Sequence, residues 1–155
     1  MLGAKGLGLV SYRNPTTGRV CLNPNYLWLD SCATYHSMFV DWCLENVHTV
    51  CTTLTGHCNN GSSTIDKKGW WGLWEFWYSP GGIANLLSIP ALEASGYTID
   101  YKTKRGTWLV TSPEGKIITF KTDVGGGLTN GMPYLDMRDK HAVALLNTVR
   151  GNFEK

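Results

Sequence analysis

The sequence has 155 residues, of which 43% are hydrophobic and 17% are charged, and its formal net charge is +2. This composition is typical of one folded domain and excludes a largely disordered chain. The small net charge argues against direct nucleic-acid binding, and no apolar run approaches the roughly 20 residues that a membrane-spanning helix needs. The first residues also lack the charged start and long apolar core of a secretory signal.

The cysteine pattern predicts reduced thiols. The five cysteines are Cys21, Cys32, Cys43, Cys51 and Cys58. An odd number at loose spacing argues against a disulfide framework and favours a reducing, cytoplasmic compartment. A zinc site is the alternative, because four potential ligands lie close together, but none of them forms a Cys-x-x-Cys pair. These four are His48, Cys51, His57 and Cys58. We expect no metal and no cofactor.

Residues 1–24 are rich in Gly, Pro, Asn and Thr, which predicts a leader that is loosely ordered or adds an edge strand. The apolar run at residues 26–29 then leads into Asp30, followed by Ser31 and small residues. This pattern predicts a buried strand that ends in a tight turn. Burial at the end of such a strand raises the pKa of a carboxyl group, and a second carboxylate nearby raises one of the two further.

Two carboxylates in such a place can share one proton and activate a water molecule. The segment around Asp30 supplies only one carboxylate, and the sequence holds no second copy of it. The partner aspartate would therefore come from a second copy of the chain.

A hairpin is predicted further along. Residues 36–45 have no clean period, so we expect His36 and Asp41 to lie in a solvated loop. Residues 47–54 alternate weakly and are rich in β-branched side chains, which favours a strand. Asn60-Gly61 follows, and Asn-Gly is the strongest short hairpin signal. This hairpin is either an ordinary surface turn or a mobile lid over a substrate.

Four of the seven tryptophans lie in residues 69–78. Both faces of the alternating pattern are apolar, so the segment predicts one central strand that is buried on both sides. Stacking of sugars or bases on these rings is the alternative, but no basic or hydrogen-bonding residues interleave with the aromatics.

A short helix is predicted next, because Ser88 suits the N-cap, Pro90 is tolerated in the first turn and Gly96 suits the position after the last turn. Turn signals then separate three strand-like segments, residues 97–101, 106–111 and 116–121.

In the last part of the chain, the strand-like patterns give way to linker and helical patterns. Residues 122–131 contain three consecutive glycines and predict a flexible linker, without the context of a phosphate-binding loop. Residues 132–137 form a short extended piece, and apolar residues at helical spacing predict an amphipathic helix over residues 139–150.

Three motifs occur in a fixed order. Residues 28–36 read Trp-Leu-Asp-Ser-Cys-Ala-Thr-Tyr-His, residues 80–89 read Pro-Gly-Gly-Ile-Ala-Asn-Leu-Leu-Ser-Ile, and residues 92–97 read Leu-Glu-Ala-Ser-Gly-Tyr. Together they resemble the Trp-x-Leu-Asp-Ser-Gly-Ala-Ser-x-His, Val-Pro-Gly-x-x-x-Asn-Leu-Leu-Ser-Val and Leu-x-x-x-Gly-Tyr blocks of copia-type retrotransposon proteases, which are retroviral-type aspartic proteases. The resemblance covers residues 25–137.

The resemblance implies a mostly β fold: a retropepsin-like, closed and barrel-like domain over residues 25–122 with one short helix. Residues 1–24 would form the leader. Residues 123–155 would form a linker and a helical extension toward the next segment of a Gag-Pol polyprotein.

The resemblance also implies an aspartic endopeptidase that cleaves polyprotein peptide bonds as a homodimer. Asp30 of each chain would hold the attacking water, one carboxylate acting as base and the other, protonated, binding the scissile carbonyl. Ser31 would hydrogen-bond across the dimer. The polypeptide substrate would contact Ala33 and lie under a flap at Asn60 and Gly61.

Cys32 departs from the family pattern, which has glycine at this position. The added Cβ and sulfur crowd a tight turn. The alternative function is therefore a non-catalytic, retropepsin-like module that binds peptide or dimerises. A Cys32 nucleophile with His36 as its base is another possibility, but a four-residue separation across a turn does not support that geometry.

Overall fold

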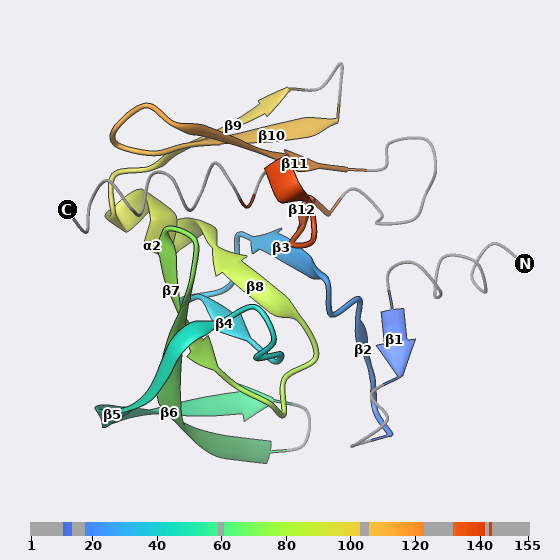
Figure 1. Ribbon diagram of the computed structural model, residues 1–155, viewed down its shortest axis with the longest axis vertical. Coiled ribbons are helices and arrows are strands. Elements are labelled where there is room, and N and C mark those ends of the chain that lie inside the picture. Colours follow the sequence, from blue (N-terminus) through green and yellow to red (C-terminus); the bar gives the residue numbers. More distant parts are fainter. Residues whose placement is uncertain are drawn as a thin grey trace, which may run out of the picture.

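The computed structural model describes residues 11–13, 18–58, 61–102, 106–122, 132–141 and 143. These residues form a ten-stranded sheet, a separate two-stranded ribbon and the short helix α2 (Ile89–Ala94). Figure 1 shows the ribbon beside the main body of the molecule. The prediction of a mostly β fold is confirmed. Within the described residues, no helix has the length and apolar character needed to cross a membrane.

The order of strands across the large sheet is β5-β6-β7-β4-β8-β3-β12-β11-β10-β9. In chain order the strands are β3 (Tyr26–Asp30), β4 (Ser37–Met38), β5 (Glu45–Cys58), β6 (Gly61–Trp71), β7 (Trp74–Tyr78), β8 (Asn85–Ser88), β9 (Thr98–Lys102), β10 (Thr107–Thr111), β11 (Ile117–Lys121) and β12 (Tyr134–Asp136). In Figure 1, β3 and β8 lie between the group β9–β11 and the group β5–β7.

Strand β3 occupies the middle of the sheet. It pairs in parallel with β8 and antiparallel with β12, so its backbone is hydrogen-bonded on both edges. Leu27, Trp28 and Leu29 are all buried, as the apolar run predicts. Since side chains alternate between the two faces of a strand, both faces of β3 are covered. Asp30 is thus the first residue after this buried run that reaches solvent.

The hydrophobic core connects β3 with its neighbours on both sides. Fully buried side chains of the core include Leu27, Met38, Phe76, Leu87 and Phe120. Burying one such side chain contributes about 1.5–3 kcal/mol. The strand that ends at Asp30 is therefore anchored in the hydrophobic core.

The aromatic segment is a hairpin, so the prediction of one continuous strand over residues 70–78 is wrong. Strands β6 and β7 meet with Trp71 opposite Trp74, and Gly72 and Leu73 form the turn. Gly72 has a φ of +59°, which a two-residue hairpin needs at its first central position and which glycine adopts without strain. Trp71 and Trp74 are buried, whereas Trp70 and Trp77 are half-buried.

The hairpin β5–β6 confirms the predicted strand over residues 47–54. Cys58 pairs with Gly61, so Gly61 already belongs to β6. Asn60 lies outside the described residues. The pairing shifts register between Glu45 and His48 and again between Thr49 and Leu54. Such irregularities bend a ribbon and increase its twist.

The predicted helix is confirmed as α2. The Ser88 hydroxyl accepts a hydrogen bond from the backbone N–H of Ala91 at 3.1 Å, which caps the helix. Leu92 is buried and anchors the helix to the core. Gly96, just after the helix, has a φ of +88°, as the predicted capping position requires.

Both end segments of the chain are described only in part. In the predicted leader, β1 (Ser11–Arg13) and β2 (Val20–Leu22) form a ribbon of their own and add no edge strand to the large sheet, while residues 1–10 and 14–17 lie outside the described residues. Strand β12 lies within the large sheet, so the sheet extends beyond the predicted limit at residue 122. Residues 123–131 of the predicted linker lie outside the described residues. So does most of the predicted C-terminal helix over residues 139–150, of which only a first helical turn is described.

Candidate active site

Asp30 is the last residue of β3 and lies directly opposite Ser88 of β8. Its side chain is half-buried. Oδ1 of Asp30 accepts a hydrogen bond from the backbone N–H of Cys32 at 2.8 Å. This local bond is the usual way in which an aspartate stabilises the turn that follows it. It leaves Oδ2 of the carboxylate to other partners.

A small cavity of about 240 Å³ lies beside Asp30. The described residues that line it are Asp30, Cys32, Ala33, Thr34, Tyr35, Ser37 and Leu86. Asp30 is the one carboxylate among them. The cavity therefore has an acidic group at its edge but lacks the second carboxylate that a shared-proton pair requires.

The predicted site residues are brought together in part. Asp30, Cys32 and Ala33 line the cavity. Ser31 is exposed next to them, and its Oγ lies 3.9 Å from Sγ of Cys32. Gly61 begins β6.

His36 is not in a solvated loop, so that expectation is wrong. The ring is largely buried and lies against Phe76, with 5.6 Å between the ring centroids. Its Nδ1 accepts a hydrogen bond from the backbone N–H of Ser88 at 2.9 Å. Burial lowers the pKa of His36 to about 4, because the charged form loses its hydration. Asp41, by contrast, is exposed as predicted.

The protonation state of His36 also bears on the alternative in which Cys32 is a nucleophile. A histidine that activates a cysteine must take up a proton near neutral pH. The pKa of about 4 and the bond from Ser88 to Nδ1 both oppose protonation of this ring. The geometry therefore disfavours a Cys32–His36 pair.

Ser88 contacts the turn after Asp30 through hydrogen bonds. Its Oγ donates a hydrogen bond to the carbonyl oxygen of Ala33 at 2.6 Å and accepts the bond from Ala91. The side chain is fully buried. Ser88 thus joins the turn, the strand β8 and the helix α2.

Asn85, at the other end of β8, is also fully buried. Its Oδ1 accepts the backbone N–H of Phe39 at 3.0 Å. Its Nδ2 donates to the carbonyl oxygens of Pro24 and Tyr26 at 3.0 and 3.1 Å. All of these groups are buried or partly buried, and leaving them unpaired would be costly. Asn85 therefore fixes the entry to β3 against β8.

Local patterns in the sequence do not predict these contacts, because they assign Ser88 only a capping role and place His36 in a solvated loop. One signal was present in the sequence. Asn85 and Ser88 are polar, yet they bracket two leucines in a segment short enough to be a buried strand. Polar residues in such a strand are expected to be hydrogen-bonded.

The described cysteines, Cys21, Cys32, Cys43 and Cys51, form no disulfide bonds. Burial raises the pKa of Cys43 to about 12. Among the described residues, no group of three or more His, Cys, Asp or Glu side chains could hold a metal ion. The side chains of His57 and Cys58, which belong to the zinc alternative, lie outside this description.

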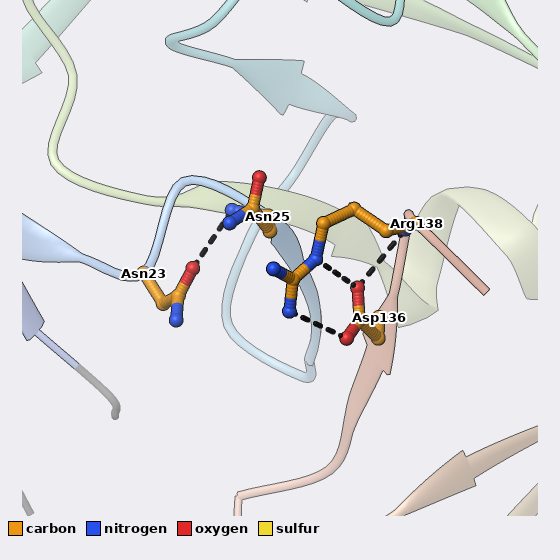
Figure 2. Close-up of polar contacts among 4 residues, drawn as sticks. All are labelled: Asn23, Asn25, Asp136 and Arg138. Carbon is orange, nitrogen blue, oxygen red and sulfur yellow. Dashed lines mark hydrogen bonds and ion pairs between the residues drawn. The ribbon is translucent and has the colours of Figure 1, made fainter. Parts of the chain in front are cut away.

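Another carboxylate borders β3, at the end opposite to Asp30. Asp136 of β12 pairs with Tyr26 and accepts two hydrogen bonds from the Arg138 guanidinium, at 3.0 Å from Nε and 2.9 Å from Nη2 (Figure 2). Burial opposes ionisation of Asp136, but the bonds and charge of Arg138 outweigh it and lower the pKa of this carboxyl group. Asp136 is thus committed to a structural ion pair.

In comparisons with known proteins, no family model matches the chain and no curated protein matches it.

Proposed function

We propose that this protein is a retrotransposon-type aspartic endopeptidase with a retropepsin-like, barrel-like fold. In this proposal two copies of the chain form a homodimer and cleave peptide bonds of a polyprotein. The position of Asp30 carries the proposal: a half-buried carboxylate at the end of the central strand, beside a small cavity that holds no other carboxylate among its described lining residues. The family in this proposal is supported by the resemblance of residues 28–36, 80–89 and 92–97 to the motifs of copia-type proteases.

The proposed reaction is hydrolysis by a water molecule held between two Asp30 carboxylates. One carboxylate takes a proton from the water, while the other, protonated, donates a hydrogen bond to the scissile carbonyl. The bond from Cys32 N–H to Oδ1 orients this carboxylate. The exposed position of Ser31 is compatible with a contact to the second chain.

The hairpin β5–β6 is the proposed lid. It consists of strands of 14 and 11 residues, and the described side chains over residues 51–53 are exposed. A long two-stranded ribbon is stable only when it packs on something else. An extended substrate under this hairpin would supply such packing and strand-like hydrogen bonds.

One observation favours the second candidate function, a non-catalytic module that binds peptide or dimerises. Cys32 is exposed and lines the same cavity as Asp30. Its sulfur occupies space beside the carboxylate where a glycine would leave room for water and substrate.

A peptidase assay separates the two candidates. The full chain and the variants Asp30→Asn, Cys32→Gly and Cys32→Ser would be compared on a fluorogenic polypeptide substrate at mildly acidic pH. An aspartic-protease inhibitor and a thiol alkylator serve as chemical controls.

We expect cleavage by the wild type and its loss in Asp30→Asn, because the amide keeps the shape of the side chain but cannot act as a base. Cys32→Gly should equal or exceed the wild type, and Cys32→Ser should remain active. Cleavage that survives in Asp30→Asn would refute the aspartic mechanism. A folded wild-type dimer without activity, together with an active Cys32→Gly, would support the binding module.

A further inference from the structure

The turn that follows Asp30 is held from one side by a single residue of β8. Ser88 donates its backbone N–H to Nδ1 of His36 at 2.9 Å and its hydroxyl to the carbonyl oxygen of Ala33 at 2.6 Å. These contacts bridge 52 and 55 residues of sequence. Ser88 is also the residue directly opposite Asp30 in the parallel pair β3–β8. The same residue therefore contacts the start, the middle and the end of the segment 30–36.

The direction of each bond is determined by the groups involved. A backbone N–H can only donate, so Nδ1 of His36 must be unprotonated, and the neutral ring carries its proton on Nε2. The Ser88 hydroxyl has one proton, which it gives to Ala33, and it accepts the N–H of Ala91 with a lone pair. Each donor in this group therefore has its own acceptor, and the directions of the three bonds are compatible with one another.

The arrangement is also rigid. Ser88 is fully buried and follows the buried Leu87 of the core, and the bond to Ala91 ties it to the start of α2. His36 is held against Phe76, which is itself fully buried. The segment 31–36 thus connects β3 to closely packed residues of β8, α2 and β7, which have little freedom to move.

Asp30 is coupled to this segment by its bond to the Cys32 N–H. A shift of Ala33 moves the neighbouring Cys32 amide and with it the preferred direction of the Asp30 carboxylate. In a reaction that depends on aligned groups, a misplacement of about 1 Å costs on the order of 100-fold in rate.

We propose that His36 and Ser88 are positioning residues: their bonds to each other and to Ala33 fix the turn that aims the Asp30 carboxylate. This inference rests on the proposed peptidase function for its kinetic consequence, but the placement of the turn can be measured without activity. It assigns a role to the histidine at the end of the Asp30 motif and to the serine at the end of β8.

The experiment uses matched pairs of variants in the full chain. His36→Asn keeps an acceptor close to the position of Nδ1, whereas His36→Phe keeps a ring against Phe76 and removes the acceptor. Ser88→Thr keeps the hydroxyl, and Ser88→Ala removes it. Thr122→Val is the control for a general loss of stability, because Thr122 makes an equally short buried bond, 2.6 Å from Oγ1 to the carbonyl of Gly106.

The first readout is the backbone amide signal of Cys32 in a ¹H–¹⁵N NMR spectrum, together with hydrogen exchange at the Ser88 amide. We expect His36→Phe and Ser88→Ala to displace the Cys32 signal, and His36→Phe to speed exchange at Ser88 by about tenfold or more. His36→Asn, Ser88→Thr and Thr122→Val should retain the wild-type Cys32 signal.

The second readout is steady-state kinetics. His36→Phe and Ser88→Ala should lower kcat about 10- to 100-fold, while KM changes by less than about threefold because substrate contacts remain. The two conservative variants should recover most of the rate, and Thr122→Val should match the wild type.

The inference would be overturned if both His36→Phe and Ser88→Ala, shown to be folded, kept the wild-type Cys32 signal. If His36→Phe does not fold, Ser88→Ala decides the question alone. Absence of cleavage in the wild type would reject the proposed function, and the NMR comparison would still decide whether these two residues set the turn.

Discussion

At the scale of single residues, the polar side chains of His36, Asn85 and Ser88 join segments that are distant in the sequence. Each is at least largely buried, and each has hydrogen-bonding partners. Removing one member of such a set leaves buried groups unpaired, which costs more than the bond itself contributes. The stability of the candidate site therefore depends on few residues.

The pH dependence of stability should reveal His36. The pKa of this residue is about 4 in the folded chain, against an ordinary value of 6.5. A group with a lowered pKa in the folded state stabilises the fold at pH values above 6.5 and loses this contribution as the pH falls through about 4. A shift of this size corresponds to an upper value of about 3 kcal/mol.

Urea unfolding at several pH values between 7 and 4 measures this contribution. The free energy of unfolding should fall more steeply with decreasing pH in the wild type than in His36→Asn, whose side chain does not titrate. The carboxyl groups are common to both proteins, so the difference isolates the histidine. Parallel curves for the two proteins would contradict the burial of a neutral His36.

Asn85 provides a second test at this scale. Asn85→Ala should lower the free energy of unfolding by about 3 kcal/mol, since it strands the N–H of Phe39 and the carbonyls of Pro24 and Tyr26. Asn23→Ala is the matched control, because its Oδ1 accepts a loop bond from the N–H of Asn25, and it should cost about 1 kcal/mol or less. Equal losses in urea denaturation would speak against a bracing role for Asn85.

At the scale of elements, local patterns predicted some features and missed others. The cap at Ser88, the glycine after α2 and the buried strand before Asp30 each follow from a few adjacent residues, and these predictions are confirmed. The apolar character of both faces of the aromatic segment predicts one strand there. This apolar pattern hides the turn signal of Gly72, the glycine at which the segment divides into β6 and β7.

The turn at Gly72 can be tested by substitution. Gly72→Ala should destabilise the protein by about 1–2 kcal/mol, because its φ of +59° is unfavourable for a residue with a Cβ. Gly81→Ala is the control, since a Cβ at Gly81 meets no atom within 4 Å and its φ lies outside the positive region. Thermal unfolding of the two variants compares them directly. A Gly72→Ala protein as stable as Gly81→Ala would show that the turn differs from this description.

At the scale of the whole molecule, the central pairings join distant segments. β3 lies between β8 and β12, which follow it only after long stretches of chain. No local period predicts such pairings, because they depend on which buried strands pack together in the folded core. For this reason the sequence indicated Asp30 as the candidate residue, whereas the support from β8 and the place of β12 in the sheet became apparent only in the structure.

A site with one carboxylate per chain would require two chains to associate. If catalysis needs Asp30 from two chains, activity depends on the concentration of dimer and is lost on dilution. A chain that cannot supply its carboxylate should also inactivate the partner with which it pairs.

Mixing the wild type with Asp30→Asn at constant total protein tests this claim most directly. After subunit exchange, random pairing in an equal mixture leaves about a quarter of the dimers with two aspartates, so the account predicts about a quarter of the wild-type cleavage rate. The rate should vary with the square of the wild-type fraction. A rate proportional to that fraction, with half the activity in the equal mixture, would mean that each chain works alone and would contradict the shared site.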